Sequence, residues 1–143
     1  MCLPITPYKV EREWKHAGLS CAVVQAQEAG HRCGYVRVPP GHPLHSKSYE
    51  TPDVDVHGGL TFAEIEPCTE HEDGQGWWFG FDCAHFMDAQ MDPEADATQL
   101  GEQAKHRLEV QRMFPGPREL REHYWTRAEV EAETERLAEQ LAA

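Results

Sequence analysis

The chain has 143 residues, a formal net charge of -12 and a hydrophobic fraction of 40%, a composition typical of one soluble domain. This acidic balance argues against an electrostatic grip on DNA or RNA, which needs clustered Lys and Arg. No apolar run approaches the roughly 20 residues of a membrane-spanning helix. The opening residues, MCLPITPYKVEREWK, lack the pattern of a secretory signal, so we expect the protein to act in the cytoplasm.

The N-terminal part predicts a short helix and then a β-hairpin. We place the helix at residues 10–19, VEREWKHAGL, with Trp14 as its apolar anchor. Residues 20–38 predict two strands joined by a turn at EAGH, residues 28–31, because apolar positions continue on both sides of that turn. Residues 39–52 predict a loop, because four prolines and a glycine interrupt them.

Residues 54–65, VDVHGGLTFAEI, predict a second hairpin. A two-residue turn at the Gly-Gly pair would mix apolar and polar side chains on each face. A three-residue connection instead pairs Val56 with Leu60 and leaves one face apolar, so we prefer it, with a glycine in the left-handed conformation. This register places His57 at the tip of the hairpin.

The aromatic run GQGWWFGFDCAHFMD, residues 74–88, predicts a central strand that packs beneath a helix. Its side chains alternate, with Trp77, Phe79, Phe81 and Cys83 on one face and Trp78, Gly80 and Asp82 on the other. Because Gly80 has no side chain, a neighbouring side chain or a ligand could approach the backbone there.

Two helices are predicted after an acidic, turn-rich connector. The first runs from about residue 98 to residue 113, with Leu100, Ala104 and Leu108 on one stripe, and PGP at residues 115–117 ends it. The second begins at about Arg127, behind the capping box Thr126-x-x-Glu129. Its docking face is marked by Val130, Leu137 and Leu141, and its solvent face by Glu129, Glu131, Glu133 and Glu139.

These elements predict an α+β fold. We expect an antiparallel-rich sheet of about five strands, a short N-terminal helix, and C-terminal helices packed on one face of the sheet. We assign residues 1–143 to a single domain, in which residues 9–86 form the sheet core and residues 98–143 form the helical C-terminal part.

The five cysteines are odd in number and form no CxxC pair, so we interpret them as reduced thiols. Two short pairs have zinc-ligand chemistry, His42-x2-His45 and Cys68-x2-His71. Neither pair belongs to a standard zinc finger, and histidine-rich loops are expected in a chain with nine histidines. We therefore predict no cofactor and keep zinc as the alternative.

The polar cluster after the aromatic strand allows three interpretations. His57, Asp82 and His85, with Asp88 as a further candidate, could hold a metal and hydrolyse a substrate. Asp82 could instead cap a turn, with His85 as an ordinary loop residue.

The third interpretation is a site for an anionic ligand. The Gly-Gly turn exposes backbone amides as anion-binding nests do, Trp78 or Tyr35 could stack on a base, and His42 or His57 could donate to phosphate. The chain has no Walker loop, GxGxxG or GxSxG. The predicted ligand-binding residues are His42, His57, Gly58, Gly59, Trp78, Asp82 and His85.

Four stretches taken together, VPPGHPLHSKSY, VDVHGGLTFAE, WWFGFDCAH and YWTRAEVEAETERLAEQLA, resemble a family of small uncharacterised proteins encoded by bacteriophages and prophages. The resemblance runs from about Trp14 to the C-terminus, except for residues 88–120. It departs at Phe86-Met87, where the relatives tend to carry small residues. The family brings no activity or catalytic residues, and it implies a small accessory phage protein in the bacterial cytoplasm.

Many accessory phage proteins counter host defence, so we predict a non-enzymatic anti-defence binder that sequesters a small anionic or nucleotide ligand. One alternative is an acidic protein-protein inhibitor that imitates nucleic acid and blocks a host defence complex. The other is a metal-assisted hydrolase that uses His57, Asp82 and His85. We expect no direct binding to nucleic acid or membrane.

Overall fold

A computed structural model describes residues 3–4, 8–26, 31–83, 88–89, 101–113 and 123–143. Several predictions fall wholly or partly outside these residues. They concern His85, most of the 28–31 turn, Leu100 and the PGP sequence.

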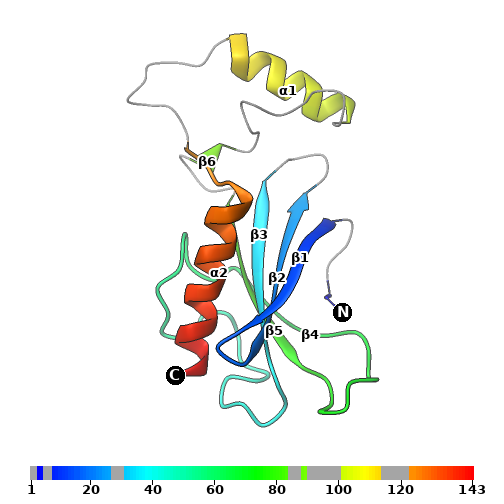
Figure 1. Cartoon of the computed structure of the whole chain (residues 1–143), viewed down its shortest axis with the longest axis vertical. Coiled ribbons are helices and arrows are strands. Elements are labelled where there is room, and N and C mark those ends of the chain that lie inside the picture. The colour runs from blue at the N-terminus through cyan, green and yellow to red at the C-terminus, as the bar shows by residue number, and fades with distance from the viewer. Residues whose placement is uncertain (1–2, 5–7, 27–30, 84–87, 90–100, 114–122) are drawn as a thin grey trace.

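Five strands form one sheet in the order β1-β2-β3-β5-β4 (Figure 1), and every neighbouring pair is antiparallel. The strands are β1 Tyr8–His16, β2 Leu19–Ala26, β3 Arg32–Val38, β4 Phe62–Ile65 and β5 Trp77–Asp82. The other elements are helix α1 Glu102–Met113, helix α2 Arg127–Ala142, and a short parallel pair, β6 Asp88–Ala89 with β7 His123–Tyr124. The predicted α+β class and the five-stranded antiparallel sheet are confirmed.

The predicted N-terminal helix is wrong, because its residues form most of β1. β1 pairs with β2 through a tight turn in which Ala17 and Gly18 both have positive φ, 52° and 81°, as the tight hairpin turns of twisted strands require. Arg12 and Trp14 lie on one face of β1, where the guanidinium carbon of Arg12 stacks 4.4 Å from the Trp14 ring centroid. This period of two is that of a strand, and the residue types alone did not distinguish it from a helix.

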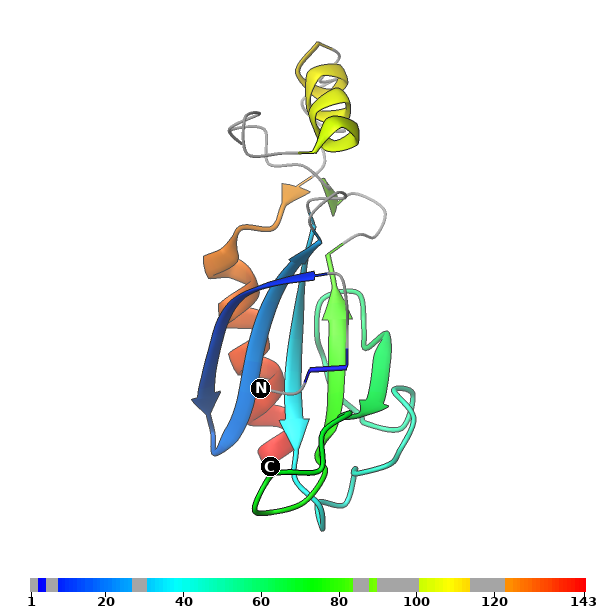
Figure 2. The ribbon, with the colours of Figure 1, turned by 90° about the vertical axis from the view of Figure 1, so that its right-hand side faces the viewer.

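Helix α2 covers one face of the sheet (Figures 1 and 2), where it contacts β1, β2 and β3. Its capping box is present in both directions, since Glu129 N donates to Thr126 Oγ1 and Thr126 N donates to Glu129 Oε1. The predicted docking residues Val130, Leu137 and Leu141 are buried. They pack against apolar side chains of the sheet, among them Val23, Val36, Phe79 and Phe81.

Only α2 of the two predicted C-terminal helices packs on the sheet. Helix α1 contacts no other helix or strand in the described part of the chain. The exposed Met113 on α1 is 70% accessible. The apolar residues Val130, Leu137 and Leu141 of α2 are buried, whereas Val110 and Met113 of α1 are exposed, and a helix gains from packing only through an apolar face that meets the core. No helix in the described ranges is both long and apolar enough to cross a membrane.

The predicted hairpin at residues 54–65 is only partly correct, because β4 alone is a strand. Val56 is buried, and Val54 and Leu60 pack against the same core. These apolar side chains are therefore shielded from water although residues 54–60 form no strand. Side chains of α2 take the place of a partner strand: Gln140 accepts from Asp55 N at 2.6 Å and donates to Asp55 O at 2.8 Å.

The predicted left-handed glycine does occur in this segment. Gly58 and Gly59 have φ of 68° and 78°, in a turn that the hydrogen bond from Gly59 N to Val56 O closes at 2.9 Å.

The second face of the sheet carries a smaller apolar cluster that includes Tyr35 and Trp78. The predicted approach to Gly80 is real and is made by a neighbouring side chain. A Cβ atom at Gly80 would lie 2.4 Å from the Tyr35 ring, and that ring packs edge-on against Phe62 with centroids 5.2 Å apart.

Three cysteines fit the prediction of reduced thiols, because Cys21, Cys33 and Cys83 are free and buried. Burial raises the pKa of both Cys21 and Cys33 to about 12, so these thiols stay protonated and unreactive. The prediction is wrong for Cys68, which is disulfide-bonded. Disulfide pairing depends on proximity in space, which sequence spacing does not reveal.

Candidate functional site

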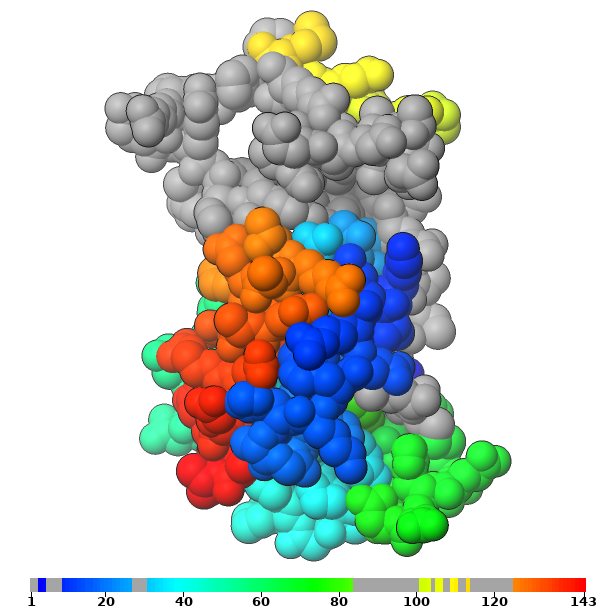
Figure 3. All heavy atoms as spheres, viewed as in Figure 1, coloured from blue at the N-terminus to red at the C-terminus, as the bar shows by residue number. Residues whose placement is uncertain are grey.

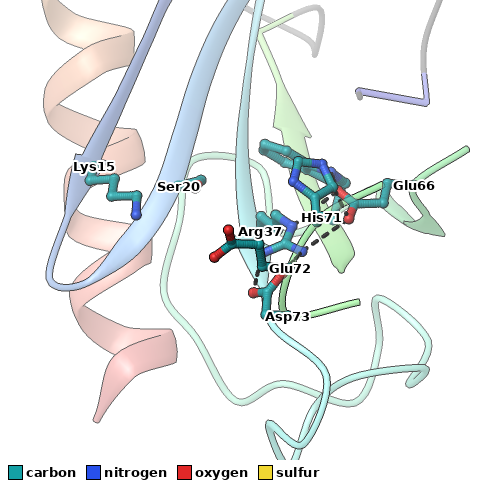
Figure 4. A pocket seen from close by; sticks show the side chains of 8 residues that line it. Lys15, Ser20, Arg37, Glu66, His71, Glu72 and Asp73 are labelled. Atoms are coloured by element: carbon teal, nitrogen blue, oxygen red, sulfur yellow. Dashed lines mark hydrogen bonds and ion pairs between the residues drawn. The ribbon is translucent and has the colours of Figure 1, made fainter. Parts of the chain in front are cut away.

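A pocket of about 460 Å³ opens on the sheet face that lies opposite α2 (Figure 4). Its lining residues are Lys15, Ser20, Arg37, Glu66, His71, Glu72, Asp73 and Trp78. Four of them form one row across β1, β2, β3 and β5, because Lys15 pairs with Ser20, Ser20 with Arg37, and Arg37 with Trp78. Residues opposite one another in antiparallel strands share a face, so the register itself builds this wall of the pocket.

A buried ion pair lies at the base of the pocket. Glu66 is 0% exposed, and both of its carboxylate oxygens accept from Arg37, through Nε and Nη2 at 3.0 Å each. Gly76 N donates to the same carboxylate at 2.6 Å and Trp78 Nε1 at 3.1 Å. A buried charge requires such partners, so Glu66 is a fixed structural part of the site.

A second carboxylate closes the rim. Asp73 accepts from Arg37 Nη1 at 2.9 Å and from Nη2 at 3.0 Å, and Gly74 O accepts from Nη2 at 3.0 Å. The Asp73 side chain is 50% exposed. The guanidinium of Arg37 is therefore held between an interior carboxylate and a carboxylate in contact with water.

Gly76 allows this close packing. A Cβ atom at this position would lie 2.1 Å from Arg37 Nε, so any other residue would displace the guanidinium from Glu66. The requirement for glycine here comes from the approach of the arginine side chain.

The charges of the cluster reinforce one another. Hydrogen bonding to Asp73, followed by that to Glu66, raises the pKa of Arg37 above its ordinary value. Burial is the largest influence on Glu66 and would raise its pKa, but hydrogen bonds from Arg37, Gly76 and Trp78 outweigh burial and lower it. The hydrogen bond from Arg37 also lowers the pKa of Asp73, so all three groups are charged near neutral pH.

Two donors of the pocket remain available to a ligand. Lys15 is exposed on β1, and its ammonium group has no ion-pair partner in the described part of the chain. Arg37 Nη1 carries two N–H groups, of which Asp73 uses one. Trp78 is 0% exposed beneath Glu66, so it forms part of the floor and does not offer a free ring face for stacking.

The predicted ligand-binding residues divide between the two faces of the sheet. Trp78 lines the pocket, and Asp82 shares its face, where it accepts from Thr61 Oγ1 at 3.1 Å. His42 and His57 lie on the α2 side, with Gly58 and Gly59 beside His57. His57 therefore contacts Glu133 of α2, whereas Asp82 binds Thr61, and His85 lies outside the described residues.

His57 is held by α2 and by the segment that precedes this helix. Its backbone N donates to Glu133 Oε1 at 2.9 Å. Its ring packs on Trp125, with centroids 4.2 Å apart and planes inclined by 35°. These contacts fix the turn at the helix, which is a structural role.

The His42-x2-His45 pair holds loops. His42 Nε2 donates to Leu141 O at 2.8 Å, while His42 Nδ1 accepts from Leu44 N at 3.0 Å. His45 Nε2 donates to Gln75 O at 2.8 Å, and His45 Nδ1 contacts Ser46 Oγ at 2.8 Å. Neither ring has a free lone pair for a metal in this arrangement.

The Cys68-x2-His71 pair is likewise unsuited to zinc, because Cys68 is disulfide-bonded. No group of three or more metal-ligating side chains occurs among the residues that the structure describes.

Comparisons with protein-family models, curated proteins and solved structures return no match.

The glutamates predicted to point from α2 into water are in part bound to the chain itself. Glu131 accepts from Arg12 Nη1 at 3.0 Å, so its side chain is only 18% exposed. His16 contacts Glu135 at 2.6 Å and Glu139 at 2.7 Å. Figure 3 shows α2, in orange to red, beside β1, in blue, and these ion pairs join the two elements.

The sequence interpretation missed most of the pocket, namely Lys15, Ser20, Arg37, Glu66, Glu72 and Asp73. One signal was present: Arg37 interrupts the apolar run YVRV in a strand that is buried from its second residue to its last. An arginine in such a strand needs a carboxylate partner, but the sequence does not say which of 25 acidic residues supplies it.

Proposed function

We propose that the protein is a non-enzymatic binder of a small anionic ligand, such as a nucleotide, and that it holds this ligand in the Lys15–Arg37 pocket. The observation that carries the proposal is the set of unused cationic donors in that pocket. Its volume of about 460 Å³ lies within the range of small-molecule sites, about 300–1,000 Å³.

Preorganisation supports a binding role. Glu66 fixes the Arg37 guanidinium from below by two hydrogen bonds, so a ligand does not have to order that side chain. A rigid donor binds more tightly than a flexible one, because less side-chain entropy is lost. The lining carries two cations, Lys15 and Arg37, and three carboxylates, so an anion would be held by the hydrogen-bond donors of Lys15 and Arg37 that have no acceptor in the described part of the chain and not by a net positive charge.

The resemblance to phage-encoded proteins gives this ligand a biological class. We propose that it is a nucleotide signal of a host defence system, sequestered in the bacterial cytoplasm. The acidic-inhibitor alternative gains less support, because several α2 carboxylates are paired within the chain. The hydrolase alternative gains less support because the His57 ring packs on Trp125, whereas Asp82 binds Thr61.

Isothermal titration calorimetry against cyclic, linear and ADP-ribose-type nucleotides tests the proposal. We expect at least one nucleotide to bind. The substitution Lys15→Ala should weaken that binding by about tenfold, since a hydrogen bond to a charged group contributes about 1.5–3 kcal/mol.

The matched control is Lys9→Ala, which removes the same charge from the same strand outside the pocket. Equal losses in the two variants would show that only the net charge matters. Silence of the whole panel would overturn the proposal of a nucleotide ligand.

A further inference from the structure

The two carboxylates that bind Arg37 are held very differently. Glu66 is fully buried and accepts four hydrogen bonds. Asp73 is half exposed, and Arg37 is its only side-chain hydrogen-bond partner in the described part of the chain. Asp73 can therefore leave the guanidinium and be solvated by water, whereas Glu66 would become an unpaired buried charge.

Asp73 also occupies the edge of Arg37 that a ligand would use. It takes the two terminal nitrogens, Nη1 and Nη2, while Glu66 takes Nε and Nη2. A guanidinium offers carboxylates and phosphates the same two-point geometry. A ligand phosphate on the Nη1–Nη2 edge of Arg37 would accept hydrogen bonds from the same donors that Asp73 now binds.

A phosphate has advantages over Asp73 on this edge. A terminal phosphate monoester carries more negative charge than one carboxylate and offers an additional acceptor oxygen. The second N–H group of Arg37 Nη1 and the ammonium group of Lys15 have no acceptor in the described part of the chain. They can supply contacts that the shorter, tethered Asp73 leaves unmade.

We propose that Asp73 is an internal competitor of the ligand, whose carboxylate occupies a phosphate subsite on the Nη1–Nη2 edge of Arg37 until a ligand phosphate displaces it. This inference rests on the proposed function and specifies a phosphoryl group as the part of the ligand that Arg37 receives. Competition of this kind lowers the observed affinity by the fraction of molecules in which the edge is free.

Inorganic pyrophosphate is the probe, because it carries the phosphoryl groups without a base or sugar. We expect Asp73→Asn to bind pyrophosphate about tenfold more tightly than the unaltered protein in calorimetry, since the competing charge is gone. Asp73→Ala removes the same carboxylate without adding an amide, and it should give the same direction of change. Circular dichroism verifies that both variants are folded.

The matched control is Glu72→Gln, which removes one negative charge from the same loop and the same pocket lining. Its affinity for pyrophosphate should change much less. Equal gains for Glu72→Gln and Asp73→Asn would overturn the competitor role, because the effect would then be general electrostatics. Unchanged or absent pyrophosphate binding in both folded Asp73 variants would overturn it as well.

The outcome is distinguishable from failure of the proposed function. If the unaltered protein binds a nucleotide and the Asp73 variants gain nothing, the binding function stands and the competitor role fails. If the nucleotide panel is silent but Asp73→Asn captures pyrophosphate, the phosphate subsite stands and the nucleotide proposal fails.

Discussion

At the scale of single residues, Arg37 organises the second face of the sheet. It brings together two carboxylates from one acidic loop that are seven positions apart, Glu66 and Asp73. Breaking a buried ion pair by removing one partner costs about 3–5 kcal/mol, because the remaining charge stays buried. The Arg37–Glu66 pair is therefore a sensitive point of the molecule, whether or not a ligand is bound.

The substitution Glu66→Gln should lower the free energy of unfolding by about 3 kcal/mol. The amide keeps the shape of the side chain, but it removes the charge that Arg37 faces and one of the two acceptor oxygens. Urea unfolding measures the change.

Glu64→Gln is the control, because Glu64 is exposed on the neighbouring strand and surface substitutions usually change stability by less than about 0.5 kcal/mol. Similar effects at the two positions would contradict the role of the buried pair.

At the scale of elements, α2 serves both as a core helix and as a hydrogen-bonding partner for residues 55–57. Gln140 accepts a hydrogen bond from the backbone N of Asp55 and donates one to its backbone O, and Glu133 accepts from His57 N. The turn that carries Gly58 and Gly59 is thus attached to the helix, and its position depends on helix docking.

Gln140→Ala should therefore destabilise the protein by about 1 kcal/mol, the net contribution of an ordinary hydrogen bond. It should also speed hydrogen exchange at the Asp55 amide, because this group loses its acceptor. The same substitution at Gln103, an exposed residue of α1, should change neither quantity. Unaltered exchange at Asp55 in the Gln140 variant would show that the helix does not hold this segment.

Some elements were predictable because their signals are local. The capping box at Thr126, the apolar stripe of α2 and the alternation along β5 each lie within one element, and the structure confirms them. β1 was mistaken for a helix because Arg12 and Trp14 show their strand period only once the partner strand is known.

The site was much less predictable than the fold. The pocket wall comes from register across four strands, and Glu66 reaches Arg37 from a loop 29 positions away. Such contacts between distant positions leave no periodic pattern in one sequence. Histidines were predicted as ligand-binding residues because imidazole binds metals and phosphates. In the structure, His42 and His57 instead connect loops to α2.

At the scale of the whole molecule, the Arg37 cluster makes stability depend on acid pH. The pKa of Glu66 is lowered from 4.5 and that of Asp73 from 3.8. At pH values between the folded pKa and the ordinary pKa of each carboxyl, the unfolded chain binds more protons than the folded one. The free energy of unfolding therefore rises with pH in this interval. The contribution is fully present above these ordinary values and is lost as pH falls through the lower folded values.

We therefore expect the free energy of unfolding to fall as pH is lowered below about 4.5 toward about 3, and to fall less steeply in the double variant Glu66→Gln/Asp73→Asn. Glu66 should supply most of the difference, because solvent screens the half-exposed Asp73. Urea unfolding over this pH range measures both slopes. Parallel curves for the two proteins would exclude the cluster as the source of the acid dependence.

The position of α2 in the chain has a consequence for biosynthesis. All five strands leave the ribosome before this helix does, at roughly 5–20 residues per second. During that interval α2 does not yet cover the hydrophobic surface formed by Val23, Val36, Phe79 and Phe81. The nascent protein is therefore prone to aggregation for several seconds. During this time chaperones can bind a hydrophobic surface that is buried in the mature protein.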